Sequence, residues 1–151
     1  MTVVAVLDSN AVDALLDQPD LSDRVAAAVD AGVLRLLYTH VTVDELAQVP
    51  DDARRADLLS LLTAYAFAVP TGDFALGASR LGMARISGED SPIDALRSSA
   101  GRHTLDALVA GTARQEGALL VTYERRLTNR ARAAGITAVT WDVLLGRLPA
   151  E

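Results

Sequence analysis

The fold of this chain is decided by its first apolar run and the residues directly after it, Val3-Val4-Ala5-Val6-Leu7-Asp8-Ser9-Asn10. Five apolar residues in a row, three of them valine, predict a buried strand. The residues after Asp8 are typical of the start of a helix. A buried strand that ends in a carboxylate therefore places Asp8 where open α/β sheets bind their ligands.

Beyond residue 10, short β-like runs alternate with longer helical ones. We expect further strands at residues 33–39, 67–70, 118–122 and 136–140. We expect helices from residue 9, around 21–32, from 42, and at 53–66, 74–86, 105–116, 125–134 and 141–148, three of them ending at Gly32, Gly117 and Gly135. The segment 87–103 is the most polar. This alternation predicts a single three-layer α/β/α sandwich with a central parallel sheet, over residues 1–151.

Composition excludes several classes of protein. Half of the 151 residues are hydrophobic, which is enough for one compact domain with a real core. Cysteine is absent, so disulfides, zinc–thiolate sites and thiol nucleophiles are excluded. No secretion signal or run of about 20 apolar residues is present. We therefore expect a soluble, cytoplasmic protein with no membrane contact.

Charge narrows the chemistry further. The formal net charge is -6, which argues against a protein that holds nucleic acid through overall positive potential, so phosphate contacts must be local. All 14 basic residues are arginine. Without lysine the chain has neither a P-loop nor a Schiff-base nucleophile.

Four acidic residues follow strands or lie near the starts of helices: Asp8, Glu45, Asp106 and Glu124. Each has an ordinary explanation when it is taken alone. Asp8 and Asp106 would complement helix dipoles, Asp106 in the first turn after Thr104. Glu45 lies three residues after Thr42, which is the spacing of a capping box, and Glu124 would be merely solvated. None of the four is decisive by itself.

Together, the four carboxylates require a compensating charge. At 4 Å, each pair repels by about 1 kcal/mol in water and by about 4 kcal/mol at an effective dielectric of 20. A hard divalent cation such as Mg²⁺ is the economical answer, because it prefers oxygen ligands. A metal-activated water also supplies a nucleophile without a histidine base. We expect the two histidines, His40 and His103, to make structural hydrogen bonds.

Four motifs carry a family resemblance. They are Leu7-Asp8-Ser9-Asn10, residues 41–47 (VTVDELA), residues 105–113 (LDALVAGTA) and residues 118–124 (ALLVTYE). In this order they resemble the acidic motifs of PIN domains and are most similar to those of VapC-type ribonuclease toxins. The resemblance covers nearly the whole chain.

This resemblance implies metal-dependent hydrolysis of RNA. It makes Asp8 and Asp106 the Mg²⁺ ligands, with Mn²⁺ as an alternative ion, and Glu45 the third acid of the cluster. Asn10 and Thr122 match supporting polar positions. The fourth motif departs from the family, which usually has Thr-Asn-Asp where this chain has Thr122, Tyr123 and the longer Glu124. A cognate antitoxin and a homodimer are also implied by the family.

Candidate RNA contacts form a second group: Arg97, Arg102, Tyr123, Arg125 and Arg126. The arginines after Glu124, including Arg130 and Arg132, are also explained as a solvated helix face, and Tyr123 either stacks on a base or packs under the acids. A PIN-like binding module that has lost catalysis remains the alternative function. A phosphoacceptor signalling domain is disfavoured because it normally uses a lysine.

Overall fold

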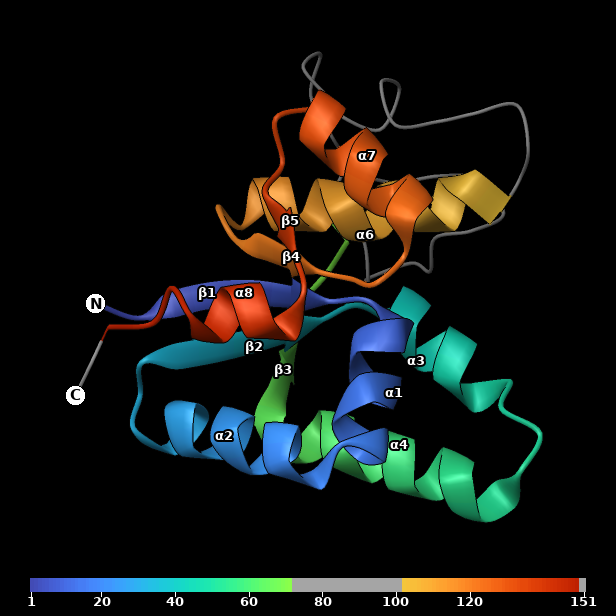
Figure 1. The fold of residues 1–151 in the computed structure, drawn as a ribbon. Coiled ribbons are helices and arrows are strands. Elements are labelled where there is room, and N and C mark those ends of the chain that lie inside the picture. The colour runs from blue at the N-terminus through green and yellow to red at the C-terminus, as the bar shows by residue number, and fades with distance from the viewer. Residues whose placement is uncertain (72–101, 150–151) are drawn as a thin grey trace.

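The computed structural model describes residues 1–71 and 102–149, without the side chains of residues 102–104 (Figure 1). The strands are β1 (Val3–Leu7), β2 (Leu34–Tyr38), β3 (Ala66–Ala68), β4 (Leu119–Val121) and β5 (Ala138–Val139). The helices are α1 (Ser9–Asp17), α2 (Pro19–Asp30), α3 (His40–Ala47), α4 (Asp52–Tyr65), α6 (Arg102–Gln115), α7 (Arg125–Ala133) and α8 (Trp141–Leu145).

All pairs of neighbouring strands are parallel, in the order β3-β2-β1-β4-β5. β1 is the central strand, and its Val6 lies in register with Leu37 of β2 and Leu120 of β4. The order of strands along the chain reverses between β1 and β4. Ligands of open α/β sheets bind at such a switch point, outside the carboxyl ends of the strands.

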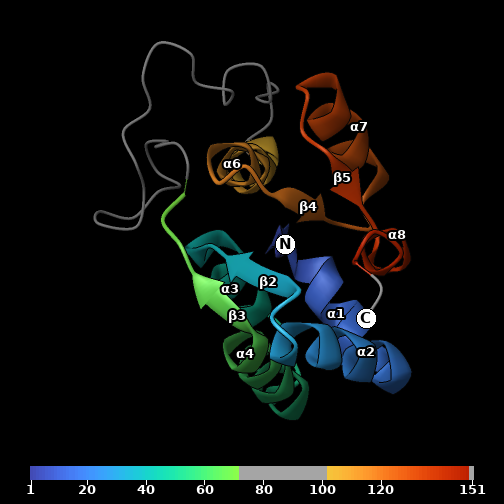
Figure 2. The same cartoon turned by 90° about the vertical axis from the view of Figure 1, so that its left-hand side faces the viewer.

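Helices cover both faces of the sheet (Figure 2). Because side chains alternate along a strand, Ala5 and Leu7 of β1 face the core formed with α1, α2, α4 and α8. Val6 faces the opposite core, which contains residues of α6 and α7. Burial on both faces explains why β1 is a continuous apolar run. The predicted three-layer α/β/α architecture is confirmed.

The predicted elements agree with the described ones, with shifts at several ends. Two shifts bear on the site: α3 begins at His40 instead of Thr42, and α6 begins at Arg102 instead of Leu105. The predicted strand 136–140 is reduced to the two residues of β5. The predicted helix 74–86, and residues 87–101 of the polar segment, lie outside the described residues. No described helix is long and apolar enough to cross a membrane.

Glycines end three helices as predicted. Gly32, Gly117 and Gly135 have φ angles of 73°, 62° and 77° and follow α2, α6 and α7. This left-handed conformation carries little steric cost only for glycine. It turns the chain from each helix into the next strand.

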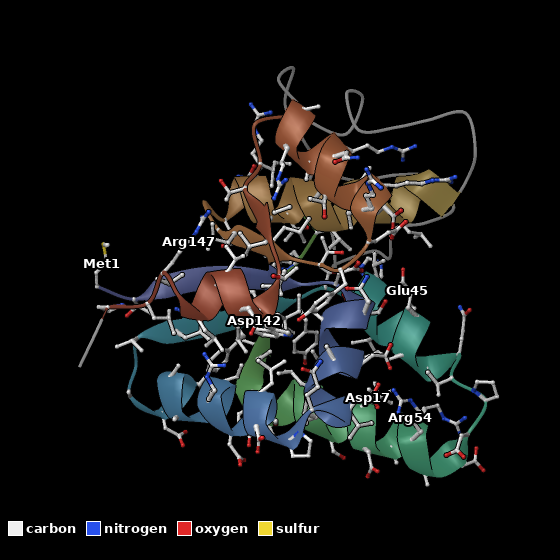
Figure 3. All side chains as sticks on the ribbon, in the orientation of Figure 1. Met1, Asp17, Glu45, Arg54, Asp142 and Arg147 are labelled. Carbon is white, nitrogen blue, oxygen red and sulfur yellow. The ribbon has the colours of Figure 1, made fainter. Side chains whose placement is uncertain are left out.

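Trp141 fixes the last helix against the first. Its side chain is completely buried, and its indole Nε1–H donates a hydrogen bond of 2.9 Å to the carbonyl oxygen of Ala11. This bond joins α8 to α1 and satisfies the polar end of a large apolar ring. On the outer side of α1, Arg54 of α4 pairs with Asp13 and with Asp17 (Figure 3).

Candidate active site

Asp8 is a buried carboxylate held by three hydrogen bonds. Only 3% of the residue is exposed. Its Oδ1 accepts the backbone N–H of Ser9 at 2.9 Å, so Asp8 caps α1. Its Oδ2 accepts Asn10 Nδ2 at 2.8 Å and the Thr122 hydroxyl at 2.9 Å. The carboxylate is therefore fixed in orientation at the carboxyl end of β1.

Asn10 and Thr122 join the two sides of the switch point. The Asn10 Oδ1 accepts the backbone N–H of Tyr123 at 2.9 Å. The Thr122 Oγ1 donates to Asp8 and accepts the backbone N–H of Glu124 at 3.1 Å. Both residues hold Asp8 while they shape the turn between β4 and α7. The structure thus brings together the two polar residues that the sequence placed beside the acids.

Glu45 reaches the same site from α3 (Figure 3). Its Oε2 accepts a short hydrogen bond of 2.5 Å from the Ser9 hydroxyl. The capping-box interpretation is wrong, because α3 begins at His40 and the Thr42 hydroxyl donates instead to the carbonyl oxygen of Leu7 at 3.0 Å. Ser9 was not predicted as a site residue. Its position beside Asp8 in the first motif was the only signal for it in the sequence.

Asp106 has the largest pKa shift among the acids of the described residues. It lies in the second turn of α6, which begins at Arg102, so the first-turn dipole explanation is wrong. Burial raises its pKa to about 7, and the charges of Glu124, Asp8 and Glu45 add to this rise, while Arg130 lowers it. Asp106 accepts no hydrogen bond from the described residues. Among the described residues, Arg130 is the one cation that lowers this pKa.

Asp8 and Glu45 carry milder forms of the same perturbation. Burial raises the pKa of Asp8, but the hydrogen bonds from Thr122 and Ser9 lower it again. Burial also raises the pKa of Glu45, and the Ser9 hydroxyl opposes the rise. The charge of Glu124 raises both pKa values. The four predicted acids are therefore one electrostatic cluster, in which hydrogen bonds oppose the rise in pKa at Asp8 and Glu45 but not at Asp106.

The cluster suits a hard cation in its chemistry. Its donors are carboxylate oxygens, the ligands that Mg²⁺ and Mn²⁺ prefer, and its excess negative charge favours a cation. Among the described residues, no three Asp, Glu or His side chains lie close enough together to hold a metal ion without moving.

The predicted RNA contacts are less well defined. Tyr123 is 43% exposed, so it does not pack under the acids. Arg125 and Arg126 are exposed in the first turn of α7. Arg102 opens α6, but its side chain and that of His103 are not described, and Arg97 lies outside the described residues. His40 is buried at the first position of α3.

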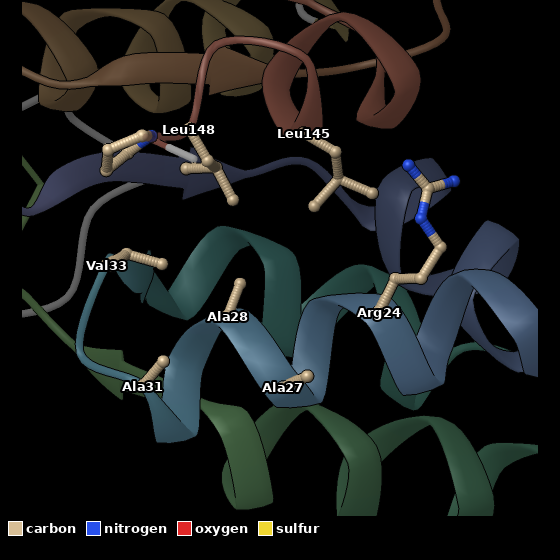
Figure 4. A pocket seen from close by; sticks show the side chains of 8 residues that line it. Arg24, Ala27, Ala28, Ala31, Val33, Leu145 and Leu148 are labelled. Atoms are coloured by element: carbon tan, nitrogen blue, oxygen red, sulfur yellow. The ribbon is translucent and has the colours of Figure 1, made fainter. Parts of the chain in front are cut away.

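A pocket lies well away from these residues. It has a volume of about 270 Å³ and is lined by α2 and the C-terminal segment, with Ala27, Ala28, Leu145 and Leu148 among its walls (Figure 4). Val33, which precedes β2, also lines it, so the pocket is at the amino end of the sheet. Ligands of this class of fold bind at the opposite end, and the pocket lacks acidic side chains.

The pKa of Asp106 predicts a stability that falls as pH rises. Its folded pKa of about 7 lies above the ordinary value of 3.8, so between about pH 4 and pH 7 the folded protein binds a proton that the unfolded chain has lost. The free energy of unfolding should therefore decrease across this window, by about 2 kcal/mol once solvent screening is allowed for. Urea unfolding in chelator at pH 5 and pH 8 measures the change.

The matched variant for this measurement is Asp106→Asn, which should lose most of the decrease. The Asp17 carboxyl does not interfere, because its hydrogen bond from Arg54 lowers its pKa below the window. Equal pH dependence in the variant and the parent protein would show that Asp106 titrates normally.

The structure is a three-layer α/β/α fold with carboxylates at the switch point of its sheet. Comparison with solved structures supports this fold. No family model and no curated protein matches the chain. Solved structures match over nearly its whole length. VapBC-1 from nontypeable Haemophilus influenzae has a TM-score of 0.56 at 15% identity, covering 93% of this chain and 99% of that one. PAE2754 from Pyrobaculum aerophilum has a TM-score of 0.53 at 21% identity, covering 100% of both.

A domain of a functionally unknown protein from Methanocaldococcus jannaschii also matches, with a TM-score of 0.50 at 14% identity, covering 99% of this chain and 94% of that one. At such identities the similarity establishes the fold. The chain shares its fold with VapBC-1 and PAE2754, consistent with the three-layer PIN-like fold predicted from its motifs.

Proposed function

We propose that this protein is a metal-dependent endoribonuclease that hydrolyses RNA phosphodiester bonds as the toxin of a toxin–antitoxin pair. The observation that carries the proposal is the cluster of four mutually repelling carboxylates at the switch point, in which the pKa of Asp106 is raised to about 7. The resemblance of the four motifs to VapC-type toxins supports it. So does the fold shared with VapBC-1.

Asp8 and Asp106 would hold Mg²⁺ or Mn²⁺, with Glu45 beside them. When bound, the ion would supply positive charge for phosphate oxygens and favour ionisation of the attacking water. Hydrolysis consumes one water for each P–O bond broken.

The chain's own residues prepare this site in two ways. Asp8 is fixed in orientation by hydrogen bonds from Ser9, Asn10 and Thr122. Asp106 gives up its proton when positive charge arrives, so metal affinity should depend on pH near neutrality.

Glu124 contributes charge more than fixed geometry. It is the N-cap residue of α7, but its side chain makes no capping hydrogen bond. Its charge raises the pKa of Asp106, Asp8 and Glu45. We assign Glu124 an outer role. Its charge increases the attraction of the site for a cation, but its side chain is longer than the usual aspartate and does not ligate the ion directly.

The changed fourth motif favours one alternative, a PIN-like module that binds RNA or protein without cleaving it. Under either function the proposal includes a cognate antitoxin as partner, a homodimer and a cytoplasmic location. The fold shared with VapBC-1 supports the antitoxin.

Removal of metal gives the direct test. We expect the purified protein to cleave RNA in Mg²⁺ or Mn²⁺ and to lose this activity in excess chelator, because uncompensated carboxylates would repel the phosphate. Gel analysis of structured RNAs measures cleavage. Activity that persists in chelator would exclude the metal-dependent mechanism. Saturable Mn²⁺ binding in calorimetry without RNA cleavage would instead identify the binding module.

A further inference from the structure

Arg130 is a half-buried arginine on the helix that begins at the acidic turn. It lies on α7, between Leu127 and Ala131, which are buried in the same core cluster as Ala107 and Ala110 of α6. Residues three and four apart share a helix face, so Ala110 lies on the same side of α6 as Asp106. Arg130 therefore borders the junction of α6 and α7, on the helix pair that carries Asp106.

Arg130 differs from the other half-buried arginines of the described residues in its lack of a bound partner. Arg54 pairs with Asp13 and Asp17, and Arg55 pairs with Asp52. The Arg130 guanidinium forms no hydrogen bond or ion pair with any described residue. A half-buried guanidinium with five donors and no acceptor is suited to an anion from outside the chain.

The position of Arg130 relative to the acids leaves room for such an anion. Arg130 and Asp106 lie on two helices in direct contact, because Leu127 and Ala131 of α7 share a core cluster with Ala107 and Ala110 of α6. Arg130 is nevertheless not in ion-pair contact with Asp106. A group held near the carboxylates and beyond direct contact can bind the far side of a phosphate whose near side meets the metal ligands.

An RNA phosphate at this site needs a positive side chain in addition to the metal ion. Four carboxylates and one divalent ion leave a net charge of −2, which repels an RNA phosphate. The whole chain adds to this repulsion with its net charge of -6. A guanidinium offers a phosphate two parallel hydrogen bonds as well as charge. Positive charge aimed at the oxygens of a reacting phosphate stabilises the transition state.

We propose that Arg130 binds a non-bridging oxygen of the RNA phosphate that is cleaved, and orients that phosphate against the acidic cluster. The inference rests on the proposed nuclease function and deepens it. The reacting phosphate would then lie beside the middle of α7. Arg125 and Arg126, at the start of the same helix, remain candidates for contacts with neighbouring phosphates.

Steady-state cleavage of a short single-stranded RNA in Mn²⁺ tests this role. We expect Arg130→Gln to lower kcat by about 10²-fold and to raise KM by about threefold, because the contact is present with bound substrate and strengthens in the transition state. Arg130→Lys should recover only part of kcat, because an ammonium keeps the charge but loses the paired hydrogen bonds. The control is Arg114→Gln, an exposed arginine in the last turn of α6, which loses the same charge far from Asp106. It should cleave like the parent protein.

Equal kcat for Arg130→Gln and Arg114→Gln, at equal thermal midpoints, would overturn the inference. A protein that cleaves no RNA at all would instead refute the proposed function. The phosphate contact is then tested by affinity, from fluorescence anisotropy of the same RNA in Mn²⁺. Weaker binding for Arg130→Gln than for Arg114→Gln supports the contact, and equal binding refutes it.

Discussion

Asp8→Asn is expected to reduce RNA cleavage by at least about 10³-fold, equivalent to roughly 4 kcal/mol of transition-state stabilisation. The substitution removes one negative charge from the proposed metal site at almost constant volume. It also replaces an acceptor with a donor in a network where Ser9, Asn10 and Thr122 all donate to Asp8. The charge and the orientation of the site are lost together.

Stability should change far less than activity. Asparagine is a good N-cap, so α1 keeps its start. The new amide group opposes one of the three donors that now bond to Asp8, which costs about 1–3 kcal/mol. The neutral side chain also avoids the cost of burying a charge near Glu124, which is what raises the pKa of Asp8. We expect the free energies of unfolding in urea to agree within about 1 kcal/mol.

The matched control is Asp20→Asn, the same chemical change at an exposed position in the first turn of α2. It should cleave RNA normally. Normal cleavage by Asp8→Asn would remove Asp8 from the mechanism.

Trp141→Ala is expected to destabilise the protein by about 3–5 kcal/mol, the usual cost of removing a large core aromatic side chain. Trp141 is completely buried among residues of α1, α2 and the sheet. The variant would leave a cavity and deprive the Ala11 carbonyl of its hydrogen bond. A loss of this size is a large part of the stability of a typical domain.

Urea unfolding followed by circular dichroism measures this effect, since the variant has no other tryptophan for fluorescence. The control is Val143→Ala on the same helix, where the valine is 47% exposed. It should change stability by less than about 0.5 kcal/mol. Similar losses for the two variants would show that α8 does not dock through Trp141.

The order of the elements could be predicted because it depends on local signals. The valine-rich run of β1 and the helix-ending Gly32 and Gly135 mark boundaries by burial on both faces and by backbone conformation. The start of α3 could not be predicted in this way. Thr42 has the sequence of a cap, but its hydroxyl is used by the carbonyl oxygen of Leu7, which is 35 residues away in the chain.

The acids of the site could be predicted for a similar reason. Asp8 and Glu124 follow strands, and the carboxyl ends of parallel strands meet at one edge of a sheet. Ser9 was missed as a site residue, and Arg130 was not separated from the other arginines of its helix, because both positions depend on which helices pack together. Nothing near Arg130 in the sequence distinguishes it from Arg125 or Arg126. The difference is its burial at the junction with α6.

The central place of β1 in the sheet also governs when the site can exist. The hydrogen bond from Thr122 to Asp8 joins residues 114 positions apart, so Asp8 gains this partner only after a long stretch of chain has been made. Contacts so distant in sequence slow folding, because a long loop must close before they form. An incomplete chain that lacks β4 therefore has Asp8 without its orienting partner. During synthesis, the acidic site therefore cannot form until β4 and Thr122 have been made.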